Sequence, residues 1–234
     1  MSEQVSYAAQ DGVAVITMDD GKVNALSPEL LAAVDLALTR AVDEGLAVLL
    51  CGRDGVFSAG FDLPTLIGGG PRAHTMLTAG FRLAERMLAL PVPTVVACGG
   101  HALAMGAFLL LAADHRVGAA GDHRIAANEV AIGLTVPAAG VELCRRRLTP
   151  AHFQRAVVNA EVHDPEAAVR AGFLDEVVPP EALRATATAV ARRLAGLDRR
   201  AHAATKLRAR SETLAALRRA IDDDAADFHL LFGS

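Results

Sequence analysis

The chain has 234 residues, of which 52% are hydrophobic and 21% are charged, and its formal net charge is −4. Such a chain can bury a sizeable core as one large domain or two small ones, which excludes a disordered protein. Because acidic residues outnumber basic ones, the chain as a whole does not attract nucleic acid or an anionic membrane, and we expect neither as a partner.

Cysteine usage and the first residues indicate a reducing compartment. The three cysteines, Cys51, Cys98 and Cys144, are widely separated and show no CxxC spacing. They therefore predict neither a disulfide framework nor a structural zinc site. Met1 is followed by neither a basic nor an apolar segment, so we expect no secretory signal and a cytoplasmic protein.

Turn and cap residues define the first elements. Asp11-Gly12 lies between two apolar runs and predicts the turn of a hairpin over residues 4–18. Ser27 before Pro28 predicts a helix start, and Gly45 predicts its end. The elements expected next are a strand over 46–51, a loop over 52–60, a flexible break over 68–71, a helix over 73–88, a strand over 94–98, a helix over 105–112, and strands over 116–119 and 124–127.

The last third of the chain reads as mostly helical. Prolines mark three helix starts, at Thr149-Pro150, Asp164-Pro165 and Pro179-Pro180, and one last strand is expected over 173–178. Strands that alternate with helices predict an α/β core, and the later helices predict a packing or assembly layer.

One uncharged stretch, 94–113, is long enough to span a bilayer. Gly99-Gly100 interrupts it, and Pro91 and Pro93 precede it. This pattern predicts a strand, a turn and a buried helix rather than a membrane span.

Two strand-to-helix junctions, over 56–63 and 99–106, are rich in small residues. Small residues let a ligand approach the backbone, and a helix start leaves N–H groups unpaired. Two such groups that face one another can stabilise a negatively charged oxygen. A third element is the segment 128–133, in which Glu129 is the one carboxylate, and its apolar neighbours 130–132 predict a raised pKa.

These segments and their order are similar to those of the crotonase superfamily, the enoyl-CoA hydratase/isomerase family. The resemblance rests on FSAGFDL at 57–63, NEVAIGL at 128–134 and PEAAVRAGFLDEVVP at 165–179, and it extends from Asn24 to Lys206. It implies an α/β fold with a crotonase-like ββα spiral core.

The resemblance also implies an assembly and a substrate. The core would occupy 1–180, and a C-terminal helical layer over 181–234 would form a homotrimer or hexamer. The substrate would be an acyl-CoA thioester, so coenzyme A is part of the substrate and no separate cofactor or metal is expected.

In that family, two main-chain amides hold the thioester oxygen while an enolate forms. The resemblance gives this role to the N–H groups of Ala59 and Met105 and the acid–base role to Glu129. Met105 stands where the family usually has glycine; its N–H is unaffected, and its side chain would shape the acyl pocket. The residues that the resemblance places along the substrate are Lys22, Val23, Ala25, Phe57, Gly60, Phe61, Asp62, Leu63, Gly106 and Phe108.

The reaction depends on a second acidic residue. Hydratases of the family carry another glutamate, which would fall at Phe108, and a phenyl ring cannot transfer a proton. Glu129 alone suffices to move a proton between C2 and C4, so the preferred reading is isomerisation of 3-enoyl-CoA to 2-enoyl-CoA. The alternatives are hydration of 2-enoyl-CoA and an acyl-CoA-binding protein without catalytic activity.

Structural roles compete with these chemical ones. Glu129 could pair with Arg124. Ser58 could be a nucleophile with His101, His115 or His123 as its base, although no GxSxG motif is present. Other residues for which structural or solvent-exposed roles are expected are Ser58 in a turn, His101 packed near the second junction, Asp62 at a helix start, Asp114 and Arg116 as an ion pair, and 145–147 on a solvated helix face.

Overall fold

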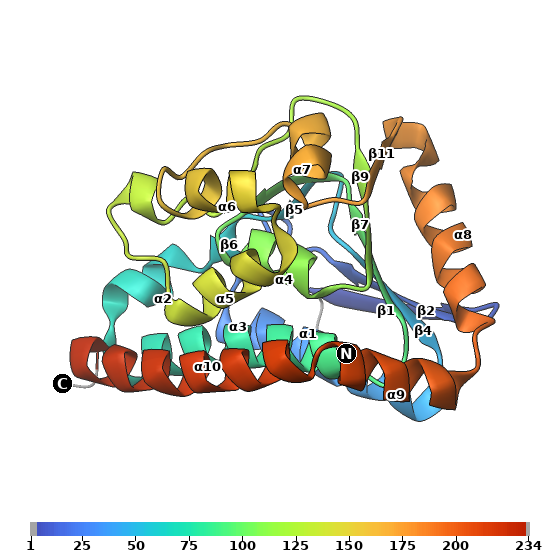
Figure 1. Cartoon of the computed structure of the whole chain (residues 1–234), viewed down its shortest axis with the longest axis horizontal. Coiled ribbons are helices and arrows are strands. Elements are labelled where there is room, and N and C mark those ends of the chain that lie inside the picture. The colour runs from blue at the N-terminus through green and yellow to red at the C-terminus, as the bar shows by residue number, and fades with distance from the viewer. Residues whose placement is uncertain (1–3, 233–234) are drawn as a thin grey trace.

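The computed structural model describes residues 4–232, and it is built on one large, mostly parallel sheet (Figure 1). The sheet has six strands in the order β1-β2-β4-β7-β9-β11. Its strands are β1 (Val5–Gln10), β2 (Val13–Met18), β4 (Ala47–Cys51), β7 (Thr94–Cys98), β9 (His115–Ala119) and β11 (Glu176–Val178). Every residue of β4 and β7 is buried, as expected for parallel strands covered on both faces.

The expected hairpin and first helix are confirmed. The strands β1 and β2 pair antiparallel across the turn at Asp11-Gly12. Helix α1 (Pro28–Glu44) begins where the Ser27 hydroxyl accepts a hydrogen bond from the Leu30 N–H at 3.2 Å, and it ends at Gly45 with φ 68°. The cap supplies an acceptor for one of the unpaired N–H groups, and only a residue that tolerates positive φ suits the end of the helix.

Two small sheets hold the junctions, and here the expectation of a loop over 52–60 is wrong. The strands β5 (Gly55–Ser58), β8 (Gly100–Leu103) and β10 (Ile125–Ala126) form one of them, and β3 (Ala25–Leu26) and β6 (Gly60–Phe61) form the other. Strand β5 forms because it pairs in parallel with β8, a partner that is distant in sequence. The approach is so close that a Cβ on Gly100 would lie 1.9 Å from the Gly55 oxygen.

Helices cover both faces of the main sheet (Figure 1). Helix α8 (Leu183–Ala195) packs on one face, over β4, β7 and β9, and the other helices lie on the opposite side. Besides α1 and α8, the helices are α2 (Leu63–Gly68), α3 (Gly70–Ala89), α4 (Met105–Ala112), α5 (Ala138–Arg147), α6 (Pro150–Val157), α7 (Pro165–Ala171), α9 (Arg199–Ala209) and α10 (Ser211–Phe232), with short 3-10 turns η1 (Val130–Ile132) and η2 (Pro180–Ala182).

The uncharged stretch 94–113 contains the expected strand β7 and the expected buried helix α4, but the residues expected to form a turn between them form the short strand β8. Within residues 4–232, no helix combines the length and the apolar character that crossing a bilayer requires. The break expected over 68–71 is a sharp corner between α2 and α3, where Gly69 and Gly70 both have positive φ.

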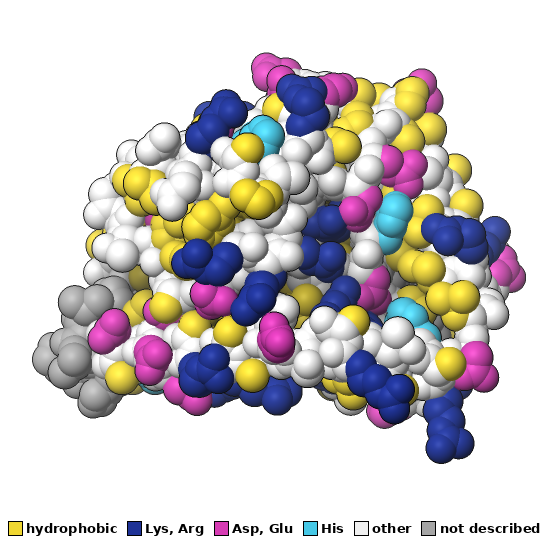
Figure 2. All heavy atoms as spheres, in the orientation of Figure 1, with side chains coloured by type: hydrophobic (Ala, Val, Ile, Leu, Met, Phe, Trp, Pro, Cys, Tyr) yellow, Lys and Arg dark blue, Asp and Glu magenta, His cyan; other side chains and the backbone are white. Residues whose placement is uncertain are grey.

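The C-terminal helices pack on the core of their own chain. Helix α10 contacts α3 and α5 along its length (Figure 1). On the face shown in Figure 2, basic and acidic side chains are interspersed along this helix. Helix α9 is attached by Lys206, whose ammonium group lies 2.8 Å from one oxygen of Asp114, while the Arg210 guanidinium lies 2.7 Å from the other.

The ion pair expected between Asp114 and Arg116 is therefore wrong. Arg116 pairs with Asp175 at 2.6 Å, and Asp114 pairs with Lys206. Both partners lie on elements that are distant in sequence, which is why the expected pair does not form. Burial disfavours the charged form of Asp114, but Lys206 and Arg210 hold its pKa below the ordinary value. Burial lowers the pKa of Lys206 to about 8, and Asp114 opposes that change.

We predict that Asp114→Ala destabilises the fold by about 3–5 kcal/mol at pH 7, because it leaves Lys206 buried without its counter-ion. Urea unfolding measures the loss. The matched control is Asp11→Asn, which breaks the exposed ion pair with Arg192 and should cost less than about 1 kcal/mol. Equal losses in the two variants would show that the Asp114 pairs do not hold α9 on the core.

Candidate active site

A buried asparagine and a buried serine fix the first junction. The Asn24 side chain donates to the Met18 and Phe57 carbonyls at 3.0 and 3.1 Å. The Ser58 hydroxyl donates to the Asn24 carbonyl at 2.8 Å and accepts from the Gly60 N–H at 3.1 Å. Ser58 is thus the turn residue that we expected, and Asn24, for which the sequence indicated no structural role, connects the junction to β2.

The prediction that the Ala59 N–H is a free oxyanion donor is wrong in this structure. This N–H donates to the Val23 carbonyl at 3.0 Å, so the protein itself occupies it. The next amide, that of Gly60, has the Ser58 hydroxyl as its acceptor. The next residue, Phe61, pairs with Leu26 where β6 and β3 lie side by side.

The two junctions meet, as the sequence predicted. A Cβ on Gly60, which has φ 94°, would lie 2.9 Å from the Ala104 Cβ and 3.4 Å from the Met105 nitrogen. A Cβ on Gly106 would lie 2.5 Å from the Ser58 carbonyl oxygen. Glycine is therefore required at both positions for the backbones to approach this closely.

Met105 is the first residue of α4, and its side chain is fully buried. The N–H of a first helical residue has no intrahelical acceptor, so that of Met105 is free for one outside the helix. The preceding residue, Ala104, has φ 49° and donates to the Ala126 carbonyl at 2.9 Å. This hydrogen bond ties the start of α4 to β10, the strand that leads to Glu129.

Glu129 is a buried carboxylate without a counter-ion. It is 7% exposed, its Oε2 has no hydrogen-bond partner, and no ion pair joins it to any side chain in 4–228, the range over which side chains are described. The expected alternative, an ion pair with Arg124, is absent from this range. Burial raises the pKa of Glu129 to about 7, and a hydrogen bond from its own backbone opposes the rise.

The raised pKa agrees with the sequence, but the expected cause was wrong. Val130 and Ile132 are 46% and 51% exposed, so these neighbours point to solvent and do not bury the carboxylate. The negative charge of Glu129 adds to burial in raising the pKa of Cys144, so α5 lies within electrostatic range of the carboxylate. Asn128, the preceding residue, also has a buried side-chain oxygen without a partner.

A cluster of aromatic side chains lies near the Met105 side chain. Phe108 is fully buried, and its ring centre lies 5.9 Å from that of Phe81, which lies 6.1 Å from that of Phe61. A Cβ on Gly80 would lie 2.5 Å from the Phe61 ring and 3.5 Å from Met105 Cγ. Position 108, where hydratases of the family carry a second glutamate, therefore belongs to a cluster of aromatic side chains.

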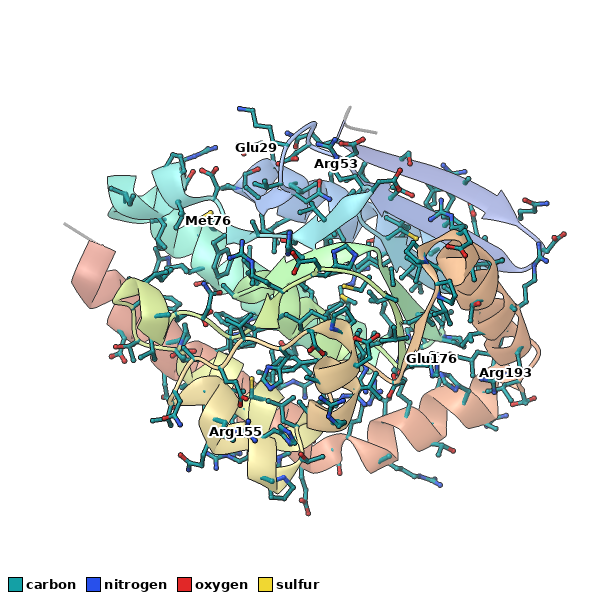
Figure 3. All side chains as sticks on the ribbon, turned by 90° about the horizontal axis from the view of Figure 1, so that it is seen from above. Glu29, Arg53, Met76, Arg155, Glu176 and Arg193 are labelled. Atoms are coloured by element: carbon teal, nitrogen blue, oxygen red, sulfur yellow. The ribbon has the colours of Figure 1, made fainter. Side chains whose placement is uncertain are left out.

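The other predicted substrate contacts differ in where the structure places them. Lys22 is exposed, and its carbonyl accepts a hydrogen bond from Arg53 at 2.8 Å. Figure 3 shows Arg53 at one edge of the molecule. Phe57 is fully buried. The positions of the remaining predicted contacts are β3 for Ala25, the N-cap of α2 for Asp62, and the exposed first turn of α2 for Leu63.

The basic run and the histidine near the second junction have structural roles. Arg147 donates to the Leu111 and Ala113 carbonyls at the end of α4, so only Arg145 and Arg146 form the solvated face expected for the run. The His101 ring accepts a hydrogen bond from the Arg124 N–H at 2.9 Å.

Two hollows lie away from Glu129 and Met105. One of about 350 Å³ is bordered by Gly99, Gly121 and His123, and one of about 470 Å³ by His202 and Lys206. No group of acidic, histidine or cysteine side chains within residues 4–228 could hold a metal ion.

Comparison with known proteins gives the same assignment as the motifs. The family model described as enoyl-CoA hydratase/isomerase matches residues 8–233. A probable enoyl-CoA hydratase of Mycobacterium tuberculosis is 33% identical over 204 residues, which cover 85% of this chain and 77% of that protein.

Solved structures share the fold. The Mtb enoyl-CoA isomerase is 49% identical with a TM-score of 0.92, and the match covers 97% of this chain and 99% of that one. The human mitochondrial delta3-delta2-enoyl-CoA isomerase is 27% identical with a TM-score of 0.92, covering 98% of this chain and 92% of that one. The mixed α/β fold with its C-terminal helices is thus the crotonase fold, and the chain belongs to the enoyl-CoA hydratase/isomerase family.

Proposed function

We propose that this enzyme isomerises 3-enoyl-CoA to 2-enoyl-CoA, with Glu129 as the one proton carrier. Glu129 removes a proton from C2, the thioester becomes an enolate, and the same carboxyl group returns the proton at C4. The bond between C3 and C4 becomes single and that between C2 and C3 becomes double. No other reactant is consumed, since substrate and product are isomers.

Two facts together carry the proposal: the Glu129 carboxylate has no partner, and position 108 has an aromatic side chain in place of a second acid. Glu129 has a pKa of about 7 and a free oxygen, whereas Phe108 is fully buried against Phe81. A base works best when its pKa is near the operating pH. Hydration needs a positioned water molecule, and the carboxylate that would assist in holding it is replaced by a phenyl ring.

The enolate requires stabilisation by hydrogen-bond donors. We assign these to the Met105 N–H at the start of α4 and, in place of Ala59, to the Phe61 N–H. In enzymes of this kind, losing one such donor typically raises the barrier by about 3–4 kcal/mol. The close contact of Gly60 with Ala104 and Met105 supports this assignment, because it brings the two segments within reach of one oxygen atom.

The coenzyme A portion would follow the exposed edge that includes Lys22, Val23 and Arg53. Arg53 donates to the Lys22 carbonyl and lies 3.7 Å from an Asp19 oxygen, so its guanidinium is held at this edge, and a guanidinium is well suited to bind phosphate. Sequence reasoning did not single out Arg53. A homotrimer or hexamer and a cytoplasmic location complete the proposal, and the exposed Val130, Ile132 and Leu134 are available for contact between copies.

A hydratase remains the second candidate, because the probable enoyl-CoA hydratase of Mycobacterium tuberculosis spans most of this chain. The two reactions are separated by assays on both substrates in deuterated water. We expect isomerisation of 3-enoyl-CoA to be faster than hydration of 2-enoyl-CoA by at least about tenfold, which corresponds to roughly 1.4 kcal/mol in barrier height. Hydration as fast as isomerisation would contradict the proposal.

Glu129→Gln tests the base. The amide keeps the shape of the side chain but cannot accept the C2 proton, so we expect kcat to fall by about 10²–10⁴-fold. The Kd for a non-reactive acyl-CoA, measured by calorimetry, should stay within a few-fold of the native value. If neither turnover nor binding changes, Glu129 is not the base. If binding is retained and the native enzyme shows no turnover, the protein is an acyl-CoA-binding protein without catalytic activity.

The pH dependence follows from the raised pKa of Glu129. Only the carboxylate can take a proton, so kcat/KM should rise with pH and level off above about 7. Stability changes in the opposite direction, because the folded pKa lies above the ordinary value of 4.5 and the fold binds the proton more tightly. Between pH 4.5 and 7 the native fold should lose up to roughly 3 kcal/mol relative to Glu129→Gln, measured by urea unfolding. A constant difference would contradict the raised pKa.

A further inference from the structure

Helix α5 begins without a cap of its own. Its N-cap residue is Pro137, which has no side-chain oxygen, and no local side chain accepts from the first N–H groups. Unpaired N–H groups at a buried helix start must find acceptors elsewhere. The first two N–H groups of α5, those of Ala138 and Ala139, therefore depend on another element.

The acceptor comes from the C-terminal helix. One Asp224 oxygen accepts from the Ala138 N–H and the other from the Ala139 N–H, both at 2.8 Å. Asp224 is 6% exposed, and no ion pair involves it within the described part of the chain. Burial raises the pKa of Asp224 against the effect of these two hydrogen bonds. Both oxygens of this buried carboxylate accept hydrogen bonds from the start of one helix, so α5 is the specific partner of Asp224.

The helix start that Asp224 holds is one end of the segment that carries Glu129. At the other end, the Ala126 carbonyl accepts from the Ala104 N–H beside Met105. Between the two ends, the Glu129 carbonyl accepts from the Ile132 and Leu134 N–H groups, both at 3.0 Å, and so shapes the turn.

Helix α5 also contacts the apolar side of the site. A Cβ on Gly140, in its first turn, would lie 2.7 Å from the Phe108 ring. Cys144, one turn further, is close enough to Glu129 for the carboxylate charge to raise its pKa. A shift of α5 would therefore change both the position and the burial of the Glu129 carboxyl group.

We infer that Asp224 is a positioning residue for Glu129: the C-terminal helix caps α5 and thereby fixes the carboxylate relative to the enolate-binding amides. This inference rests on the proposed role of Glu129 as the base. It also gives α10 a role in the site of its own chain, beyond packing (Figure 1).

The test compares Asp224→Ala with Asp223→Asn, an exposed acid one position earlier on the same helix. Loss of the cap should lower kcat by about 10–100-fold, as expected for a misplaced catalytic group, with KM changed less than threefold. The acidic limb of the kcat profile should move to lower pH, because a loosened segment admits water to Glu129. The control should keep the native kcat, KM and limb.

A rescue variant separates positioning from general damage. Pro137→Ser in the Asp224→Ala background supplies a local N-cap hydroxyl to α5. The double variant should have a kcat at least threefold higher than that of Asp224→Ala. Asp224→Asn keeps one acceptor oxygen and should fall between the native enzyme and Asp224→Ala. These two variants keep the test decisive if Asp224→Ala folds poorly.

Two results would overturn the inference. One is a native kcat and an unshifted limb in Asp224→Ala. The other is a lowered kcat with an unshifted limb that Pro137→Ser does not restore. Failure of the proposed function is distinguished by Glu129→Gln: if that variant retains turnover, Glu129 is not the base. If it loses turnover while Asp224→Ala keeps it, only the positioning role fails.

Discussion

A carboxyl group enclosed by protein on most sides, with one oxygen left unpaired, is the constraint on which this structure depends. Transferring an ionised carboxylate from water costs several kcal/mol unless a partner compensates it. Glu129 has no such partner in the described chain, and its pKa rises to about 7 as a result. A fold that keeps this group accepts reduced stability at neutral pH, and the neighbouring helices must hold the carboxyl group in place.

The backbone around the carboxylate is held by close contacts that only small residues permit. Gly60 and Gly106 bring the two junctions together, and the Ala104 N–H links the second junction to the strand before Glu129. The start of α4 and the strand before Glu129, which carry the proposed donor and base, are therefore held together by the protein's own backbone. Preorganised donors of this kind lower a barrier because they need no rearrangement as charge develops.

Local signals in the sequence predicted local structure well. Ser27 and Gly45 predicted both ends of α1, and the motifs predicted which segments would meet and that Glu129 would have a raised pKa. Pairings between distant segments were not predictable in the same way. The Ala59 N–H is occupied because β3 and β6 lie side by side. Neither residue type nor spacing reports which backbone group faces which.

The burial of Glu129 shows the same limit. The apolar residues next to it in the chain point to solvent, whereas α5 lies within its electrostatic range. Sequence neighbours predicted the correct pKa direction for the wrong reason, since a carboxylate responds to whatever surrounds it in space. Asp224 and Arg53 escaped notice for a related cause, because a lone acid or arginine acquires its partners only when distant helices and loops pack together.

The C-terminal helices illustrate how stability and chemistry can share one scaffold. Their attachment uses two aspartates in opposite ways. Asp114 belongs to the core and receives cations from α9 and from Arg210 at its C-terminal end, whereas Asp224 belongs to α10 and reaches the start of α5 in the core. The first contact fixes where the C-terminal segment joins the body. The second holds the start of α5, which ends the chain segment that carries Glu129, so under the proposed mechanism the placement of α10 bears on the proton transfer as well as on the fold.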